Sequence, residues 1–251
     1  MRLLLGSEYR TLAELAASLA ELERTLQSRG DRRAIFATAY VISCRELRRQ
    51  IEGGVFEDAA WVTQCALAFG NLYREALAAY EDGETQGVPK SWRLAFDTAV
   101  NGAASATQDL LLGINAHINY DLPIALNSVK IDPNRAARRR DFMSLNAAFS
   151  RAAEQMKEGI AQVYPFYFRW IERVVSRVDK RIALFGLMEW REAAWEAAIL
   201  LADISSEEER LRRFRLLDER ARLNALRILA PAAAHPTLFH VLRRYEVFPP
   251  G

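Results

Sequence analysis

Residues that interrupt helices are scarce in this sequence, and its first proline is Pro89. The 12 glycines and 8 prolines supply only 20 of the 251 residues, whereas about 12% is usual. No region alternates polar and apolar residues as a strand would, and no linker rich in Gly, Ser or Pro divides the chain. The sequence therefore predicts an all-α fold: a single domain over residues 1–251, built as a bundle of about eight or nine helices around a central polar-lined helix.

Capping and stop signals place the expected helices. Thr11 and Glu14 form a capping box, in which each side chain binds a backbone N–H at the other residue, and Gly30 stops the helix that follows. We expect further N-caps at Ser91, at Asp132 before Pro133, and at 205–206. The expected helices are about 12–29, 31–52, 58–82, 91–120, 133–163, 166–178, 179–203 and 205–229, with a last short one through 242.

Two breaks are expected inside and after the fourth of these helices. Thirty residues would span about 45 Å, so we expect a kink or break near Gly102 or Gly113. Pro123 is expected to prevent continuation, because Leu122 before it is pushed out of the α region. A loop or short turn is then expected over 124–131.

The bulk composition excludes several classes of protein. Hydrophobic residues make up 51% and charged residues 26%, which excludes a disordered chain. No apolar run reaches the about 18 residues of a membrane span. The formal charge of +2 gives no reason to expect nucleic acid as a partner. The apolar run at the N-terminus is too short for a signal peptide, so we expect a cytoplasmic protein whose two cysteines, Cys44 and Cys65, are reduced.

The segment 97–121 carries polar residues where a core helix would be apolar. It reads DTAVNGAASATQDLLLGINAHINYD, and no Lys or Arg occurs from residue 98 to 126. Along one drifting helical stripe lie Asp97, Asn101, Ser105, Asp109, His117 and Asp121, with Asn115 and Asn119 beside it. A buried Asn or Asp costs about 1–3 kcal/mol unless it finds partners. The stripe therefore indicates a satisfied polar network, a wet cavity or a site.

Three stretches of the sequence resemble an uncharacterised bacterial all-helical family, a domain of unknown function. They are GINAHINYDLP at 113–123, VPKSWRLAFD at 88–97 and WREAAW at 190–195. Together they cover most of the chain in order. The resemblance implies the helical fold and the position of the site, and it implies no particular reaction.

His117 and Asp121, four residues apart and followed by Pro123, are also similar to the helix motif of the zinc phospholipase C and single-strand nuclease superfamily. In that superfamily both residues bind zinc, and side chains at i and i+4 can close on one ion. The superfamily needs further histidines, one of them just after the proline, where this chain has Ile124. Three histidines in the whole chain cannot build a trinuclear cluster. A single divalent metal such as zinc on His117 and Asp121 remains an alternative.

Without a metal or other cofactor, which is the preferred interpretation, the same pair suits acid–base chemistry. His117 would give or take a proton at neutral pH, and Asp121 or Asp109 would orient its ring. Asn115 and Asn119 would present amide donors to a substrate oxygen. The remaining candidates for substrate binding are Asn101, Tyr120 and Arg191, of which Arg191 is expected to enter the interior and pair with an aspartate of the stripe.

Three hypotheses of function follow from these patterns. The first is a soluble enzyme that performs proton transfer (cyclisation, isomerisation, lyase chemistry or hydrolysis) on a small, largely apolar substrate in an inter-helix pocket around His117. The second is a metal-dependent hydrolase with His117 and Asp121 as ligands. The third is a non-catalytic helical binding or scaffold protein whose polar stripe is structural. A homodimer is possible in each case.

Other charged groups favour surface roles. The run 138–140 is three arginines, for which a solvated face is favoured over a phosphate site. Glu208–Arg212 and Glu209–Arg213 have the spacing of ion pairs on an exposed helix. His235 and His240 lie five residues apart, off a common helical face, and are expected at the surface.

Overall fold

A computed structural model describes residues 5–84, 86–146 and 180–234 of the chain, with the side chains of the last range described from 186 to 230. All regular structure in these ranges is helical, which confirms the all-α prediction. None of the helices within these ranges is long and apolar enough to cross a membrane.

The first three helices follow the predicted boundaries closely. They are α2 (Leu12–Ser28), α3 (Ala34–Glu52) and α4 (Ala59–Glu81). The capping box is present, since Thr11 Oγ1 accepts from the Glu14 N–H at 3.1 Å and Glu14 Oε2 accepts from the Thr11 N–H. Gly30 takes a φ of +64°, a left-handed conformation that suits glycine and ends the helical path.

The long polar segment breaks at the first of the two expected glycines. Helix α5 (Lys90–Val100) ends before Gly102, whose φ is +54°, and α6 (Ala106–Ala116) then starts from a new capping box at Ser105. Gly113 lies inside α6 without a break. The cap of α5 differs from the prediction, because Asp218 of a distant helix accepts the N–H groups of Lys90 and Ser91 at 2.8 and 2.9 Å and also the Ser91 hydroxyl.

The prediction that Pro123 stops the helix is wrong. A π-helical turn, η1 (His117–Asp121), leads directly into α7 (Leu122–Ser128), so most of the expected loop at 124–131 is helical. Leu122 keeps α-helical angles, φ −60° and ψ −47°, and its N–H bonds to the carbonyl of His117. The wider π turn places Pro123 in the first turn of α7, a position at which a residue without a backbone N–H is tolerated.

The second half of the chain adds three helical segments to the described fold. Residues 135–146 are helical, two residues later than the predicted start at Pro133, and Asp132 binds the Arg135 guanidinium instead of capping the backbone. The others are α10 (Lys180–Ala202) and α11 (Glu207–Ala234). Helix α11 continues through Pro231 to Ala234, although it was expected to end near 229; the φ of proline is compatible with a helix, but its ring leaves one helical hydrogen bond unmade. The helices expected over 147–178 and through 242 lie outside the described residues.

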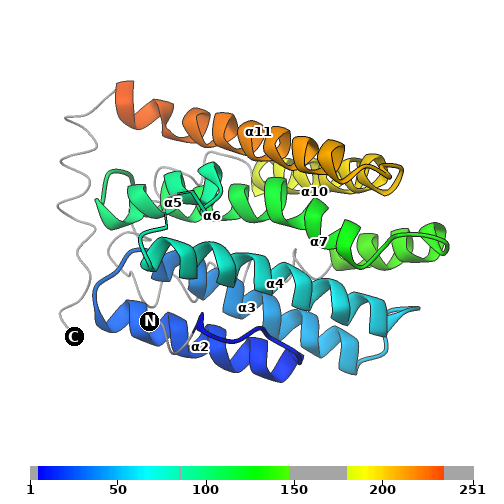
Figure 1. The fold of residues 1–251 in the computed structure, drawn as a ribbon. Coiled ribbons are helices and arrows are strands. Elements are labelled where there is room, and N and C mark those ends of the chain that lie inside the picture. The colour runs from blue at the N-terminus through cyan, green and yellow to red at the C-terminus, as the bar shows by residue number, and fades with distance from the viewer. Residues whose placement is uncertain (1–4, 85, 147–179, 235–251) are drawn as a thin grey trace.

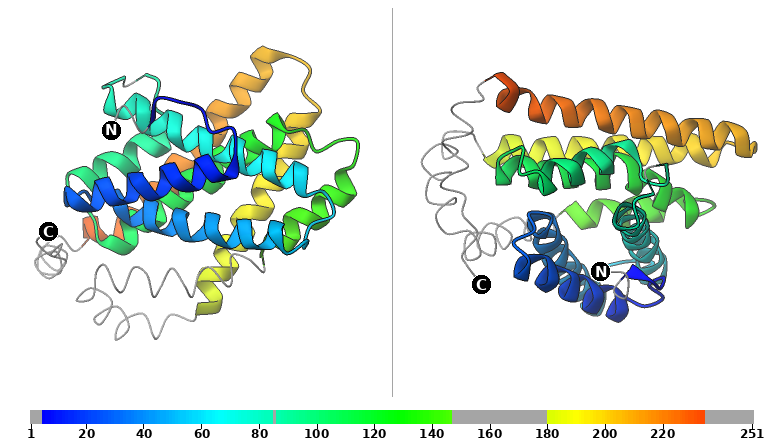
Figure 2. Two further views of the ribbon diagram at one scale, coloured as in Figure 1. Left: turned by 90° about the horizontal axis from the view of Figure 1, so that it is seen from below. Right: turned by 60° about the vertical axis from the view of Figure 1, so that its left-hand side comes forward.

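The polar segment lies in the middle of the molecule, as predicted. Figures 1 and 2 show α2, α3 and α4 on one side, α10 and α11 on the other, and the run α5–α6–η1–α7 between them. Aromatic and aliphatic side chains from both sides pack on this run. His117 and Asp121 therefore sit at the centre of the bundle, whereas Asn101, between α5 and α6, is exposed.

Candidate functional site

A cavity of about 140 Å³ lies beside the π turn. Its wall comes from α3, α4, α6, η1, the segment 135–146 and α10, and it is almost wholly apolar. Helix α3 contributes lining residues from Phe36 to Leu47, so the cavity runs along three turns of that helix. Its volume is close to that of the engineered cavity of about 150 Å³ that binds benzene. The space is thus large enough for a small apolar molecule.

His117 is part of this wall, and its two ring nitrogens have different surroundings. The side chain is only 5% exposed, and Nδ1 lies 2.8 Å from Asp121 Oδ2. The same carboxyl oxygen accepts the indole N–H of Trp92 at 2.9 Å. His117 Nε2 is buried and has no hydrogen-bond partner among the described residues. One nitrogen is therefore fixed by the protein, and the other remains for something in the cavity.

Aromatic rings hold the imidazole in place. Phe69 stacks on it with ring centres 3.4 Å apart and planes 9° from parallel, and Tyr40 meets it edge-on at 4.6 Å. Phe36, Tyr73 and Trp92 approach it within 6.0 Å. This packing leaves the ring little freedom to turn, which is typical of a pre-organised group.

Two tyrosine hydroxyls near His117 are also buried without partners. They belong to Tyr40, which lines the central cavity, and to Tyr73, which lines a separate void of about 10 Å³. The two residues thus share one chemical group and similar burial but face different spaces. A void of that smaller size holds about one water molecule.

Burial shifts the protonation of the groups around the cavity towards their neutral forms. It lowers the pKa of His117 well below its usual value and raises the pKa of Asp121 well above its own, and the nearby carboxylates of Asp218 and Glu75 raise the latter further. The Trp92 N–H acts in the opposite direction on the pKa of Asp121. Burial likewise raises the pKa of Cys44 and of Cys65 to about 12. Both thiols therefore stay protonated and are poor nucleophiles.

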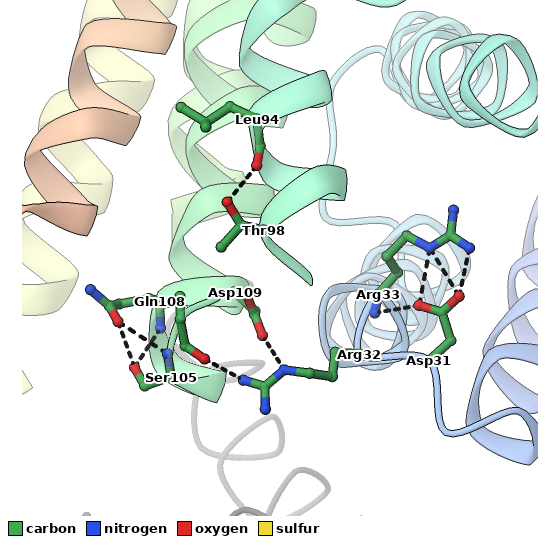
Figure 3. Close-up of polar contacts among 9 residues, drawn as sticks. Asp31, Arg32, Arg33, Leu94, Thr98, Ser105, Gln108 and Asp109 are labelled. Atoms are coloured by element: carbon green, nitrogen blue, oxygen red, sulfur yellow. Dashed lines mark hydrogen bonds and ion pairs between the residues drawn. The ribbon is translucent and has the colours of Figure 1, made fainter. Parts of the chain in front are cut away.

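Asp109 lies away from the His117–Asp121 pair. Its Oδ2 accepts from Arg32 Nε at 2.7 Å, and Arg32 also donates to the carbonyl of Ala104 (Figure 3). Asp109 borders the small void rather than the central cavity. Asp109 anchors the start of α3 on α6, and of the two aspartates only Asp121 hydrogen-bonds to the His117 ring.

The asparagines predicted to bind substrate make internal contacts. Asn115 Nδ2 donates to the carbonyl of Ala221 on α11 at 2.8 Å, and Asn119 Nδ2 donates to Asn115 Oδ1 at 3.0 Å. Neither residue lines the central cavity among the described side chains. This part of the stripe is a structural network that joins the central run to α11.

The other three predicted residues lie in different places. Asn101 caps the C-terminus of α5 at the surface, and Tyr120 packs partly buried against the core on the side away from the cavity lining. Arg191 is buried in the cavity wall, 3% exposed. It donates to Asn146 Oδ1 and to the carbonyl of Phe142, and its expected pair with an aspartate of the stripe stays a prediction. Desolvation lowers the pKa of Arg191 to about 9.

Surface charges behave largely as the sequence indicated. Arg140 pairs with Glu57, Arg139 pairs with Glu192, and Arg138 donates to the carbonyls of Lys130 and Asp132, so the arginine run is bound by groups of the same chain. On α11 the predicted Glu209–Arg213 pair is present at 3.1 Å. Arg212 pairs with Glu209 instead of Glu208.

The His117–Asp121 pair does not suit a metal ion in this arrangement. The described residues contain no group of three or more His, Cys, Asp or Glu side chains placed to hold one. Asp121 Oδ2 lies against His117 Nδ1 and accepts the Trp92 N–H, so Nε2 is on the far side of the ring and the two residues do not close on one ion as the i, i+4 motif requires. A zinc site needs three or four protein ligands.

The aromatic wall was not identified from the sequence. Phe36, Tyr40, Phe69 and Tyr73 occur on α3 and α4 among other apolar residues at ordinary helical spacing. No local pattern separates them from a packed core. The available signal was the concentration of aromatic residues on two neighbouring helices, α3 and α4. It indicates a site only once the structure shows that the imidazole of His117 lies among them.

A family model described as a family of unknown function (DUF5995) matches residues 12–231, most of the chain. No curated protein and no solved structure matches the sequence of this chain.

Proposed function

The chain belongs to the family of unknown function DUF5995, and we propose that it binds a small, largely apolar molecule in the central cavity and performs acid–base chemistry on it with His117. One observation carries the proposal: Nε2 of His117 is buried in the cavity wall with no partner in the part of the chain that the structure describes, while Nδ1 is held by Asp121. A buried unsatisfied nitrogen costs about 1–3 kcal/mol. A polar atom of a bound molecule would remove that cost.

The surroundings of the pair suit proton transfer. A proton leaves His117 Nε2 for the substrate as the proton shared with Asp121 settles on Nδ1, which leaves a carboxylate. That carboxylate accepts the N–H groups of Trp92 and of His117, so the charge formed is stabilised where it appears. General acid–base catalysis of this kind contributes about 10²–10⁴ in rate.

The binding part is tested with three six-carbon probes: n-hexane, hexan-1-ol and hexan-2-one. His117→Phe keeps the stacked ring but removes the nitrogen, and Tyr73→Phe is the matched control, since it removes a buried hydroxyl outside the cavity. Calorimetry should show the alcohol and the ketone binding the parent. The tighter-bound of the two should bind His117→Phe about tenfold more weakly, as for the loss of a hydrogen bond of about 1.4 kcal/mol. The control should match the parent.

Two results would overturn this part. Failure of both oxygenated probes to bind the parent protein would remove the cavity as a binding site. Equal binding by the parent and by His117→Phe would remove His117 from contact with the molecule.

The chemical part is tested in D₂O with hexan-2-one. His117 Nε2 gives its proton to the carbonyl oxygen as a solvent water takes a proton from the neighbouring carbon, and the reverse step in D₂O returns deuterium to that carbon; NMR measures the rate of this exchange. The parent should exceed His117→Phe by at least about tenfold, within the range for one general acid or base. Equal rates would show that the site only binds.

A further inference from the structure

We propose that the cavity selects molecules whose polar atom is a hydrogen-bond acceptor, such as the carbonyl oxygen of an aliphatic ketone or aldehyde, because His117 presents an N–H group to it. This inference rests on the proposed binding at His117. It adds the direction of the hydrogen bond, and with it the chemical class of the ligand.

The direction follows from how many protons the pair holds. His117 and Asp121 lie 5% and 1% exposed among aromatic rings, where a net charge is costly. With two protons the pair has no net charge, either as a neutral imidazole with a carboxylic acid or as an imidazolium with a carboxylate. Both arrangements leave a hydrogen on Nε2, since the contact with Asp121 involves Nδ1. Only the singly protonated pair, with a net charge of −1, would present a lone pair at Nε2.

The charges near the pair disfavour that singly protonated form. The two ionisable groups that shift the pKa of Asp121 are Asp218 and Glu75, and both are acidic. Among the described residues, the Trp92 N–H acts in the opposite direction and stabilises the carboxylate. Burial and the two acidic groups outweigh it at rest, so the pair holds two protons and the carboxylate forms only during proton transfer.

Glu46 is the one carboxylate among the described residues of the wall, and both of its oxygens already accept, from Arg49 and from Gln50. The Ser43 hydroxyl donates to the carbonyl of Ala39 at 2.9 Å. Cys44 and Cys65 are protonated thiols, because burial raises the pKa of each to about 12. The Tyr40 hydroxyl is unpartnered and able to donate. A ligand that brings only a donor leaves the hydrogen on His117 Nε2 unpaired, whereas one that brings an acceptor satisfies it.

The shape of the cavity favours a linear molecule. From Phe36 to Leu47 the lining on α3 extends about 16 Å at 1.5 Å per residue, while the volume is only about 140 Å³. A space that is long for its volume suits an unbranched chain better than a fused ring system.

Asp121→Asn offers a sharp test, because it should reverse the direction of the hydrogen bond. Asparagine keeps the shape, and its amide oxygen can accept from both Trp92 Nε1 and His117 Nδ1, as the carboxyl oxygen does. The imidazole would then carry its single hydrogen on Nδ1, and Nε2 would become an acceptor. The parent should therefore bind hexan-2-one about tenfold more tightly than hexan-1-ol, and Asp121→Asn should prefer the alcohol. Tyr73→Phe should keep the parental preference.

The outcomes separate this inference from the proposed function. If neither oxygenated probe binds the parent, the proposed function fails and the inference fails with it. If both bind but the parent prefers the alcohol or shows no preference, the direction of the bond is wrong and the binding site stands. A preference that is the same in the parent and in Asp121→Asn would show that the proton on Nε2 does not decide selection. Thermal unfolding of each variant confirms that the compared proteins are folded.

Discussion

Gly113 controls the position of an aromatic ring that borders the cavity, and its replacement by alanine gives a quantitative test of the packing. A Cβ at this position would lie 2.5, 2.6 and 2.9 Å from Cδ2, Cγ and Cβ of Phe36. Real Cβ contacts essentially never fall below 3.0 Å, and two of these atoms are close to the Phe36 backbone. The ring must therefore move as a whole, and such overpacking costs about 1–3 kcal/mol.

Gly186 is the matched control. It also lies inside a helix, α10, but a Cβ there meets nothing within 4 Å. Alanine in a helix interior is favoured over glycine by about 1 kcal/mol, so Gly186→Ala should raise the free energy of unfolding by that amount. Gly113→Ala gains the same propensity but loses about 1–3 kcal/mol to overpacking. It should thus lie between parity with the parent and about 2 kcal/mol below it.

Thermal unfolding followed by circular dichroism measures the difference. For a chain of this length 1 kcal/mol corresponds to about 2–4 °C in Tm, so Gly186→Ala should unfold above the parent and Gly113→Ala below Gly186→Ala. Because the Phe36 ring lines the cavity, its displacement should also weaken the binding of hexan-2-one in Gly113→Ala alone. An increase in Tm equal to that of Gly186→Ala would refute the reasoning, since it would mean that Phe36 moves without cost.

Three further changes test other parts of the structure. Asp218→Ala removes the acceptor shared by the N–H groups of Lys90 and Ser91. It should lower the free energy of unfolding, measured by urea titration, by about 0.5–2 kcal/mol or more, as for a lost N-cap; an unchanged midpoint would contradict this. Asn115→Ala should cost about 1–3 kcal/mol in the same titration, yet leave hexan-2-one affinity within about twofold, and a large loss of affinity would restore Asn115 to the site. Burial raises the pKa of Asp121, so the folded protein keeps the carboxyl protonated at pH values above its usual pKa of about 4. The free energy of unfolding of the parent, relative to that of Asp121→Asn, should therefore be greatest below pH of about 4 and fall as the pH rises through the raised pKa. A difference that rises with pH would show that the carboxyl is ionised in the folded state.

The helices were predictable from the sequence because their signals are local. The Thr11–Glu14 capping box, the leucines spaced three and four apart after it, and Gly30 each act within one helical turn. The break at Gly102 is equally local, since a left-handed φ favours glycine. The same local reasoning failed at Pro123, because a π turn inserted before the proline changes which N–H groups need partners.

The candidate site was predictable only in part. The spacing of His117 and Asp121 is a local property of a helix, and their contact follows from it. The fate of Asn115 depended on where α11 lies, and that of Asp109 on where Arg32 lies, 77 residues away in sequence. One-dimensional patterns place polar groups on a face but do not say which neighbour satisfies them.

The cap that Asp218 provides for α5 has a consequence for the order of events during synthesis. The acceptor lies 127 residues after Ser91, so at about 5–20 residues per second the ribosome supplies it about 6–25 s after the donors. During that interval only water is available to the N–H groups of Lys90 and Ser91, so the first turn of α5 lacks its cap. A nascent chain stalled before residue 218 should therefore show α5 with weaker hydrogen-exchange protection than α2, whose capping box is complete within four residues.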